Sequence, residues 1–181
     1  MPPSLSTTSY ALLSLLVIDG GSDEGMTGYE IKQRADFTLR FYWVSPAMSQ
    51  IYTELDRLLS HSYVAAVEET SGKRTSKRYR ITSTGREALQ TWLHRSEDDF
   101  PVLKHPIALR LMLGSLMGVD EVRAMLDRYE KALSERREEL EAVREMLGDR
   151  EEVAYPARVA EWGLSFFDSE AATINRVRDS L

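Results

Sequence analysis

Residues 45–60 constrain the fold of this chain more than any other segment. At about 100° per residue, the apolar side chains fall on one side of a helix and the polar ones on the other. Ser45 and Pro46 place a capping residue and a helix-starting proline before this pattern, so a helix is predicted from there to about Ser60. Such a helix must bury one side and present the other. The apolar side holds Met48, Ile51, Leu55, Leu58 and Leu59; the polar side holds Ser49, Thr53, Asp56, Arg57 and Ser60, flanked by Gln50 and Tyr52.

Two further helices are expected before this one. Residues 8–18 are largely apolar and follow several Ser and Thr residues that can cap a helix. Thr27 and Glu30 have the spacing of a capping box, which predicts a second helix to about Phe37. Residues 38–44 are β-prone and aromatic, and we expect a short strand or an extended turn there.

A β-hairpin is expected after the two-sided helix. Residues 63–68 are a strand candidate, residues 70–76 a turn, and residues 77–82 a second strand with alternating apolar and basic side chains. Thr84 and Glu87 repeat the capping-box spacing and open a fourth helix. Three helices, a hairpin and a helix form the order of a winged helix-turn-helix, in which the third helix enters the DNA major groove.

The charge of the chain is unevenly distributed. The net charge is −6, yet residues 1–95 carry 11 basic and 10 acidic side chains, whereas residues 96–181 carry 12 and 19. Residues 73–80 hold five basic side chains and no acidic one, at the expected tip and second strand of the hairpin. Such a cluster suits a phosphate backbone. The alternative, a solvated charged turn, stays open on charge alone.

The second half of the chain has the pattern of long helices. His105 and Pro106 begin a short helix, and Asp120 caps a long one that Gly148 ends. A last helix carries an aromatic stripe of Tyr155, Val159, Trp162 and Phe166. The long helix carries a heptad seam that is broken only at Arg136, formed by Val122, Leu126, Tyr129, Leu133, Leu140, Val143 and Leu147.

We interpret these helices as an arm that pairs two chains, because a heptad seam requires a helical partner. The alternative is an antiparallel hairpin within one chain, packed on the first domain. The expected fold is mainly α with a small β-hairpin. It divides into a winged helix-turn-helix DNA-binding domain at residues 1–95, a linker at 96–105 and a C-terminal α-helical dimerisation domain at 106–181.

Several classes of function are excluded by what the sequence lacks. There is no cysteine, and the three histidines show no metal-ligand spacing, so no metal or other cofactor is expected. Neither a phosphate-binding glycine loop nor a nucleophile elbow is present, so we expect no enzyme. The longest apolar stretch, residues 10–18, is too short to span a bilayer, and the first basic side chain is Lys32. We therefore expect a cytoplasmic protein.

Four segments cover most of residues 8–92: T-S-Y-A-L-L-S-L-L at 8–16, G-Y-E-I at 28–31, Q-I-Y-T-E-L at 50–55 with Leu58, and R-Y-R-I-T-S-T-G at 78–85. In these segments and their order, the chain resembles the PadR family, the phenolic-acid-responsive transcriptional regulators. The hairpin at residues 63–82 is the wing of this fold. The sequence departs from the family pattern at Ser62, where the helix before the wing usually ends in glycine. Serine tolerates a positive φ less well than glycine, so we expect a local adjustment rather than a different fold.

The resemblance implies a homodimeric regulator of double-stranded DNA, often a repressor, whose affinity a small ligand releases. Glutamine and arginine match adenine and guanine edges, Ser and Thr hold phosphates, and the Tyr52 hydroxyl either donates to a phosphate or packs on the core. The wing lysines and arginine are expected to meet phosphate or the minor groove. The DNA-contact candidates are Ser49, Gln50, Tyr52, Thr53 and Arg57 on the third helix, and Lys73, Arg74 and Lys77 in the wing.

An effector, if the protein has one, is expected to be aromatic or hydrophobic and to lie between the two domains. Trp92 and Trp162 are its aromatic candidates, although tryptophans at such positions are more often core residues. A dimer implies an inverted-repeat operator. The competing interpretation is a helical protein–protein adaptor whose winged helix does not bind DNA, and the acidic net charge favours it slightly.

Overall fold

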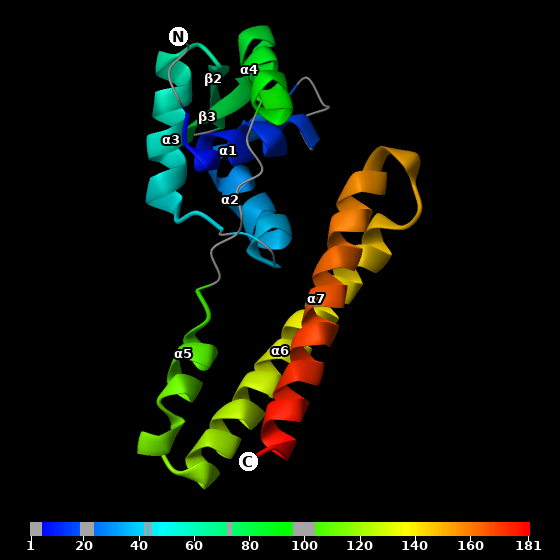
Figure 1. The fold of residues 1–181 in the computed structure, drawn as a ribbon. Helices are drawn as coiled ribbons and strands as arrows, with labels where there is room; N and C mark the ends of the chain where they lie inside the picture. The colour runs from blue at the N-terminus through cyan, green and yellow to red at the C-terminus, as the bar shows by residue number, and fades with distance from the viewer. Residues whose placement is uncertain (1–4, 19–23, 42, 44, 72–73, 96–103) are drawn as a thin grey trace. The chain divides into compact units, whose positions relative to one another are not determined.

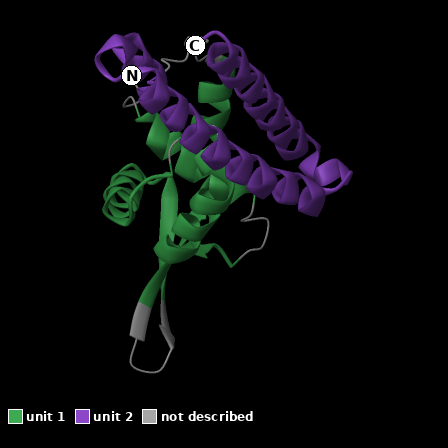
Figure 2. Cartoon of the chain, turned by 90° about the horizontal axis from the view of Figure 1, so that it is seen from below, with its two compact units in different colours: residues 1–99 green, residues 100–181 purple. Residues whose placement is uncertain are grey.

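The computed structural model describes residues 5–18, 24–41, 43, 45–71, 74–95 and 104–181, and the side chains of these residues except at 69–71, 74, 75 and 95. The chain forms two compact units, residues 1–99 and residues 100–181 (Figures 1 and 2). In the described residues, no helix is long and apolar enough to cross a membrane.

The first unit contains four helices and a small sheet in its described part. Helix α1 and helix α3 contribute the centre of its core, where Leu12, Leu16, Ile51 and Leu55 are almost completely buried. The elements in chain order are α1 (Thr7–Ile18), β1 (Met26–Thr27), α2 (Gly28–Thr38), a 3-10 helix (Leu39–Phe41), α3 (Met48–Ser60), β2 (Val64–Ser71), β3 (Arg74–Ile81) and α4 (Ser83–Arg95).

The sheet is antiparallel with the order β1-β3-β2. The predicted hairpin is present, but its strands are longer than expected, since β2 and β3 pair from Val64 opposite Ile81 to Ser71 opposite Arg74. The predicted turn at 70–76 was therefore too long. The strand β1 was not predicted, because two residues are too short to show a strand period.

Three local predictions about helix boundaries were wrong. Helix α3 begins at Met48 after the N-cap residue Ala47, and not at Pro46. The expected strand or turn at 38–44 is helical at its start, because α2 runs to Thr38 and a 3-10 helix follows. Helix α4 begins one residue before Thr84, and the Thr82 hydroxyl accepts the Gly85 N–H at 3.0 Å.

Two other local predictions are confirmed. The capping box of α2 is complete: the Thr27 N–H donates to Glu30 Oε2 at 2.7 Å, and the Glu30 N–H donates to Thr27 Oγ1 at 3.2 Å. Ser62 has a φ of 58°, in the left-handed region that favours glycine. The positive φ expected at this position is thus present with serine in place, whereas the expected local adjustment away from it is not seen.

The second unit is helical in its described part. Its elements are α5 (Pro106–Met112), a 3-10 helix (Gly114–Leu116), α6 (Val119–Leu147), a 3-10 helix (Glu151–Val153) and α7 (Ala154–Asp179). The predicted starts and ends at His105 and Gly148 are confirmed, since His105 caps α5 and Gly148 ends α6 with a φ of 61°. Asp120 lies in the first turn of α6, and the N-cap residue is Gly118.

The heptad seam of α6 packs on α7 of the same chain, and the two helices run antiparallel side by side (Figure 1). Leu126, Leu133 and Leu140 on α6 are buried, and so are Phe167 and Ile174 on α7. The expectation that this seam pairs two chains was wrong, because a helical partner within the chain already covers it.

Salt bridges link α6 to α7 along the hairpin. Arg137 Nε donates to Asp168 Oδ1 at 2.6 Å, and Arg144 Nε donates to Glu161 Oε1 at 2.8 Å. Near the end of α7, Arg178 pairs with both Asp127 and Glu130 on α6. These pairs are partly exposed, so they contribute to the register of the hairpin more than to its stability.

Candidate nucleic-acid interface

Helix α3 presents the predicted polar side to solvent. All five of its candidate DNA-contact residues are exposed: Ser49, Gln50, Tyr52, Thr53 and Arg57. The opposite side is buried through Ile51, Leu55 and Leu58. The structure therefore brings the candidates of this helix together on one surface.

Helix α3 is tied to α1 by a buried polar contact. The Glu54 carboxylate accepts hydrogen bonds from the hydroxyls of Ser6, at 3.0 Å, and of Ser9, which is fully buried. A buried hydroxyl that loses its acceptor is costly, as Ser9 would be without Glu54, so this contact holds α3 in one rotation about its axis. That rotation decides which side chains face outward.

The connection between α2 and α3 is also held by side chains. Ser45, which was expected to cap α3, instead donates to Asp36 Oδ1 on α2 at 2.6 Å and accepts from Lys32 Nζ at 3.2 Å. Hydrogen bonds from Lys32 and then from Ser45 lower the pKa of Asp36. The charged carboxylate thus holds Ser45, in the connection that leads to α3, against α2.

The start of α2 adds residues that the sequence did not single out. Tyr29 is 60% exposed, and its hydroxyl accepts a hydrogen bond from Gln33 Nε2 at 3.2 Å. The Tyr52 ring of α3 packs against Gly28, the first residue of α2. The sequence places Tyr29 and Gln33 four residues apart on the outer side of an amphipathic helix. Polar surface residues generally have such spacings, so this pattern does not single them out.

The wing is joined to α2 through Arg78. Its guanidinium donates to both carboxylate oxygens of Glu30, at 3.2 and 3.1 Å, and to the Gly25 carbonyl at 2.8 Å. The alternation of residues 77–82 predicts Arg78 and Arg80 together on one outer basic face of the hairpin, but only Arg80 is exposed. Burial would raise the pKa of Glu30, but its contacts with Thr27 and with Arg78 lower it. Arg78 therefore holds β3 against α2.

The predicted phosphate contacts of the wing are described only in part. Lys77 is exposed on β3, opposite Glu68 of β2. The backbone of Arg74 begins β3, and Lys73 lies outside the described residues. The wing thus carries an acidic residue on the strand beside its basic cluster.

The two effector candidates lie in different units. Trp92 of α4 packs against the core of the first unit and stacks on Tyr10, with ring centroids 4.7 Å apart and planes 9° apart. Trp162 of α7 is 76% exposed.

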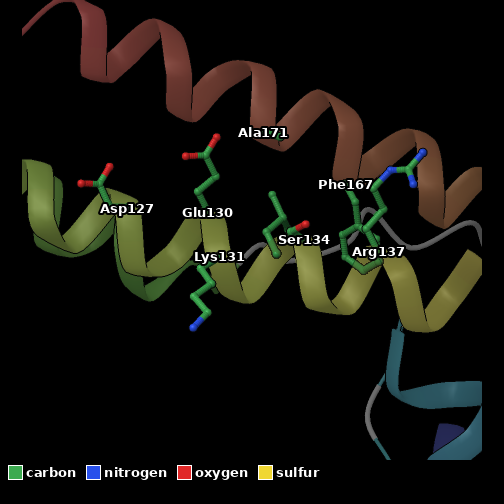
Figure 3. A pocket seen from close by; sticks show the side chains of 8 residues that line it. Asp127, Glu130, Lys131, Ser134, Arg137, Phe167 and Ala171 are labelled. Carbon is green, nitrogen blue, oxygen red and sulfur yellow. The ribbon is translucent and has the colours of Figure 1, made fainter.

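A shallow pocket lies along the side of the α6–α7 hairpin (Figure 3). It has a volume of about 470 Å³ and neither tryptophan lines it. Its lining residues are Asp127, Glu130, Lys131, Leu133, Ser134, Arg137, Phe167 and Ala171.

Comparisons with known proteins agree with this geometry. Residues 15–91 match the model of the transcriptional regulator PadR-like family. Bacillus subtilis PadR in complex with operator DNA has a similar fold, with a TM-score of 0.83, 20% identity, and coverage of 99% of this chain and 100% of that one. No curated protein sequence matches the chain significantly.

Two further solved structures share the fold over nearly the whole chain. Bacillus subtilis PadR in complex with p-coumaric acid has a TM-score of 0.75 at 20% identity and covers 97% of this chain and 98% of that one. A PadR-like transcriptional regulator from Bacillus cereus has a TM-score of 0.77 at 16% identity and covers 99% and 98%. Residues 15–91 thus match the PadR-like family model, and the chain shares the fold of these PadR structures over nearly its whole length.

Proposed function

We propose that this protein regulates transcription by placing α3 in the major groove of double-stranded DNA. The observation that carries the proposal is the exposed polar side of α3, which the Glu54 hydrogen bonds fix to α1 beside a paired β-hairpin. A recognition helix needs such a side, because base edges are read by side chains held in one orientation.

The exposed residues of α3 fall into different roles. Gln50 and Arg57 carry the groups that read adenine and guanine edges. The Thr53 hydroxyl donates to the Ser49 carbonyl of its own helix at 3.0 Å, which leaves its methyl group and an oxygen lone pair for DNA. Ser49 is assigned to a phosphate, as is the Tyr52 hydroxyl.

The wing is assigned to the DNA backbone. Lys73, Arg74 and Lys77 add affinity that does not depend on sequence, because each phosphate contact releases condensed counterions. Replacing Lys77 with alanine is expected to weaken binding to specific and random duplexes alike. It should also lower the log–log salt slope by about 1 for each phosphate that the lysine neutralises.

We further propose that the protein acts as a homodimer on an inverted repeat, as a repressor. The α6 seam is covered, so the pairing surface is assigned to exposed apolar side chains of the second unit. Obligate interfaces bury about 2,000 Å² or more and are apolar. The exposed set is Leu109, Met112, Leu113 and Leu116 after the linker, and Tyr155, Trp162 and Phe166 on α7. A monomer of the full chain at micromolar concentration in light scattering would contradict this.

A small aromatic or hydrophobic effector is the proposed release signal, since one similar structure is a complex of PadR with p-coumaric acid. Trp92 and Trp162 are its proposed contacts. A titration with p-coumaric acid should quench tryptophan fluorescence, and Trp162→Ala should weaken that response. The double variant Trp92→Phe with Trp162→Ala keeps only Trp43, and quenching that persists in this variant would argue for another site.

The experiment that tests the function is a mobility shift with the region upstream of its own gene and a random duplex of equal length. Specific affinities exceed non-specific ones by typically about 10³-fold or more. A regulator shifts the upstream duplex at far lower concentration, and Gln50→Ala should lose about 1–3 kcal/mol there with little change on the random duplex. Equal, weak binding to both would favour the adaptor interpretation. As a regulator of chromosomal DNA, the protein is assigned to the cytoplasm and to no enzymatic role.

A further inference from the structure

Tyr29 at the start of α2 presents a hydrogen-bond donor to solvent. Its side chain is 60% exposed, and its oxygen accepts the hydrogen bond from Gln33 Nε2 at 3.2 Å. A phenol has one hydrogen to donate, and an amide N–H that points at the oxygen leaves that hydrogen free to point elsewhere. With Gln33 donating to its oxygen, the Tyr29 hydroxyl keeps its own hydrogen for another acceptor.

The residue before Tyr29 lies against α3. Gly28, the neighbour of Tyr29, contacts the Tyr52 ring, whose side chain is 44% exposed. The nearby carboxylate of Glu30 accepts hydrogen bonds from the Thr27 N–H and from Arg78. The first turn of α2, which carries Tyr29, therefore lies against α3 at Tyr52.

We propose that Tyr29, oriented by Gln33, is a second contact with the DNA phosphate backbone that sets how α3 sits in the groove. The proposal rests on the DNA-binding function proposed above. A phosphate oxygen is an acceptor only, so it fits a group that has a hydrogen to donate. Tyr29 is a contact residue in this scheme, and Gln33 is a positioning residue that acts through the Tyr29 hydroxyl.

A contact from a neutral phenol differs from a contact by lysine in one measurable way. Lysine replaces a condensed counterion, and its removal lowers the salt slope. A phenol releases no counterion by charge neutralisation, so its removal weakens binding while leaving the slope unchanged. Because phosphates carry no sequence information, the weakening should be equal on specific and random DNA.

The test is Tyr29→Phe in the full chain, which removes one exposed oxygen atom. Binding to the upstream duplex and to a random duplex is measured by fluorescence anisotropy over a range of salt concentrations. We expect affinity to fall about 5-fold per contact on both duplexes, or about 25-fold when both subunits of a dimer make it. The salt slope and the melting temperature should match those of the unmodified protein.

Gln33→Met tests the positioning role, with Gln90→Met on the exposed surface of α4 as the matched control. Gln33→Met should weaken binding to both duplexes, and it should add nothing in a Tyr29→Phe background. Unchanged binding of Tyr29→Phe to both duplexes would overturn the inference, as would a weakening confined to the upstream duplex. If the unmodified protein binds neither duplex, the proposed function itself fails, which is a distinct result.

Discussion

The ring of Tyr52 on α3 lies against the α-carbon of Gly28, at the first turn of α2. A Cβ atom at Gly28 would lie 2.7 Å from Tyr52 Cε1 and 2.9 Å from Cζ, closer than packed carbon atoms approach. Glycine at this position therefore lets an aromatic side chain of the proposed recognition helix close over the start of the preceding helix. The contact relates the two helices of the helix-turn-helix directly.

Gly28→Ala is expected to displace the Tyr52 ring and to weaken DNA binding about as much as Tyr52→Ala does. The ring is half exposed and free to turn into solvent, so the melting temperature should change little. In a Tyr52→Ala background, Gly28→Ala should have no further effect on affinity, because the atoms that clash are gone. Equal decreases of affinity in both backgrounds, measured by anisotropy, would show that Gly28 does not act through Tyr52.

Gly85 in the first turn of α4 is expected to be essential for the stability of the first unit. A Cβ there would lie 2.1 Å from the Tyr63 carbonyl oxygen, and backbone cannot move aside as a side chain can. Gly85→Ala should therefore lower the free energy of unfolding by about 1–3 kcal/mol or more, although alanine favours helices. Thr84→Ala at the exposed neighbouring position is the control. If urea titration shows that Gly85→Ala raises the free energy of unfolding, the predicted clash with the Tyr63 carbonyl oxygen is contradicted.

Ser62→Gly is expected to stabilise the protein. Ser62 has a φ of 58°, where a side chain costs about 1 kcal/mol or more and glycine costs little. After the greater unfolded-state entropy of glycine is subtracted, the gain in unfolding free energy should be about 0.5 kcal/mol. Ser60→Gly, two residues earlier and still in α3, should destabilise instead. Equal effects of the two substitutions in thermal unfolding would rule out the backbone explanation.

The contribution of Glu30 to stability should disappear in acid. Its pKa is lowered in the folded protein, so its hydrogen bonds stabilise the fold at neutral pH and are lost as the pH falls through the folded pKa. Glu30→Gln keeps the capping-box geometry but loses the charge that pairs with Arg78, so it should cost about 1 kcal/mol at pH 7 and almost nothing well below pH 4. Glu87→Gln on the surface of α4 is the matched control, and unfolding is measured by urea titration at each pH. A cost of Glu30→Gln that is the same at both pH values would contradict the charge-based explanation.

The sequence by itself determined which segments become helices and which side of α3 faces outward. Both depend on contacts between residues three or four positions apart, and the capping box of Thr27 and Glu30 is such a contact. The candidates Ser49, Gln50, Tyr52, Thr53 and Arg57 were for the same reason placed on one exposed surface. The positive φ at Ser62 could be anticipated from the family resemblance alone.

Only the tertiary structure decided which partner each side chain takes. Ser45 donates a hydrogen bond to Asp36 across the turn and therefore does not cap α3. Arg78 donates to Glu30 and therefore does not lie on an outer basic face. The heptad pattern of α6 predicts a surface that packs on another helix. The pattern does not indicate whether that helix belongs to the same chain. Here α7 folds back after Gly148 and covers the seam, because a covalently linked helix has a far higher effective concentration than a second molecule.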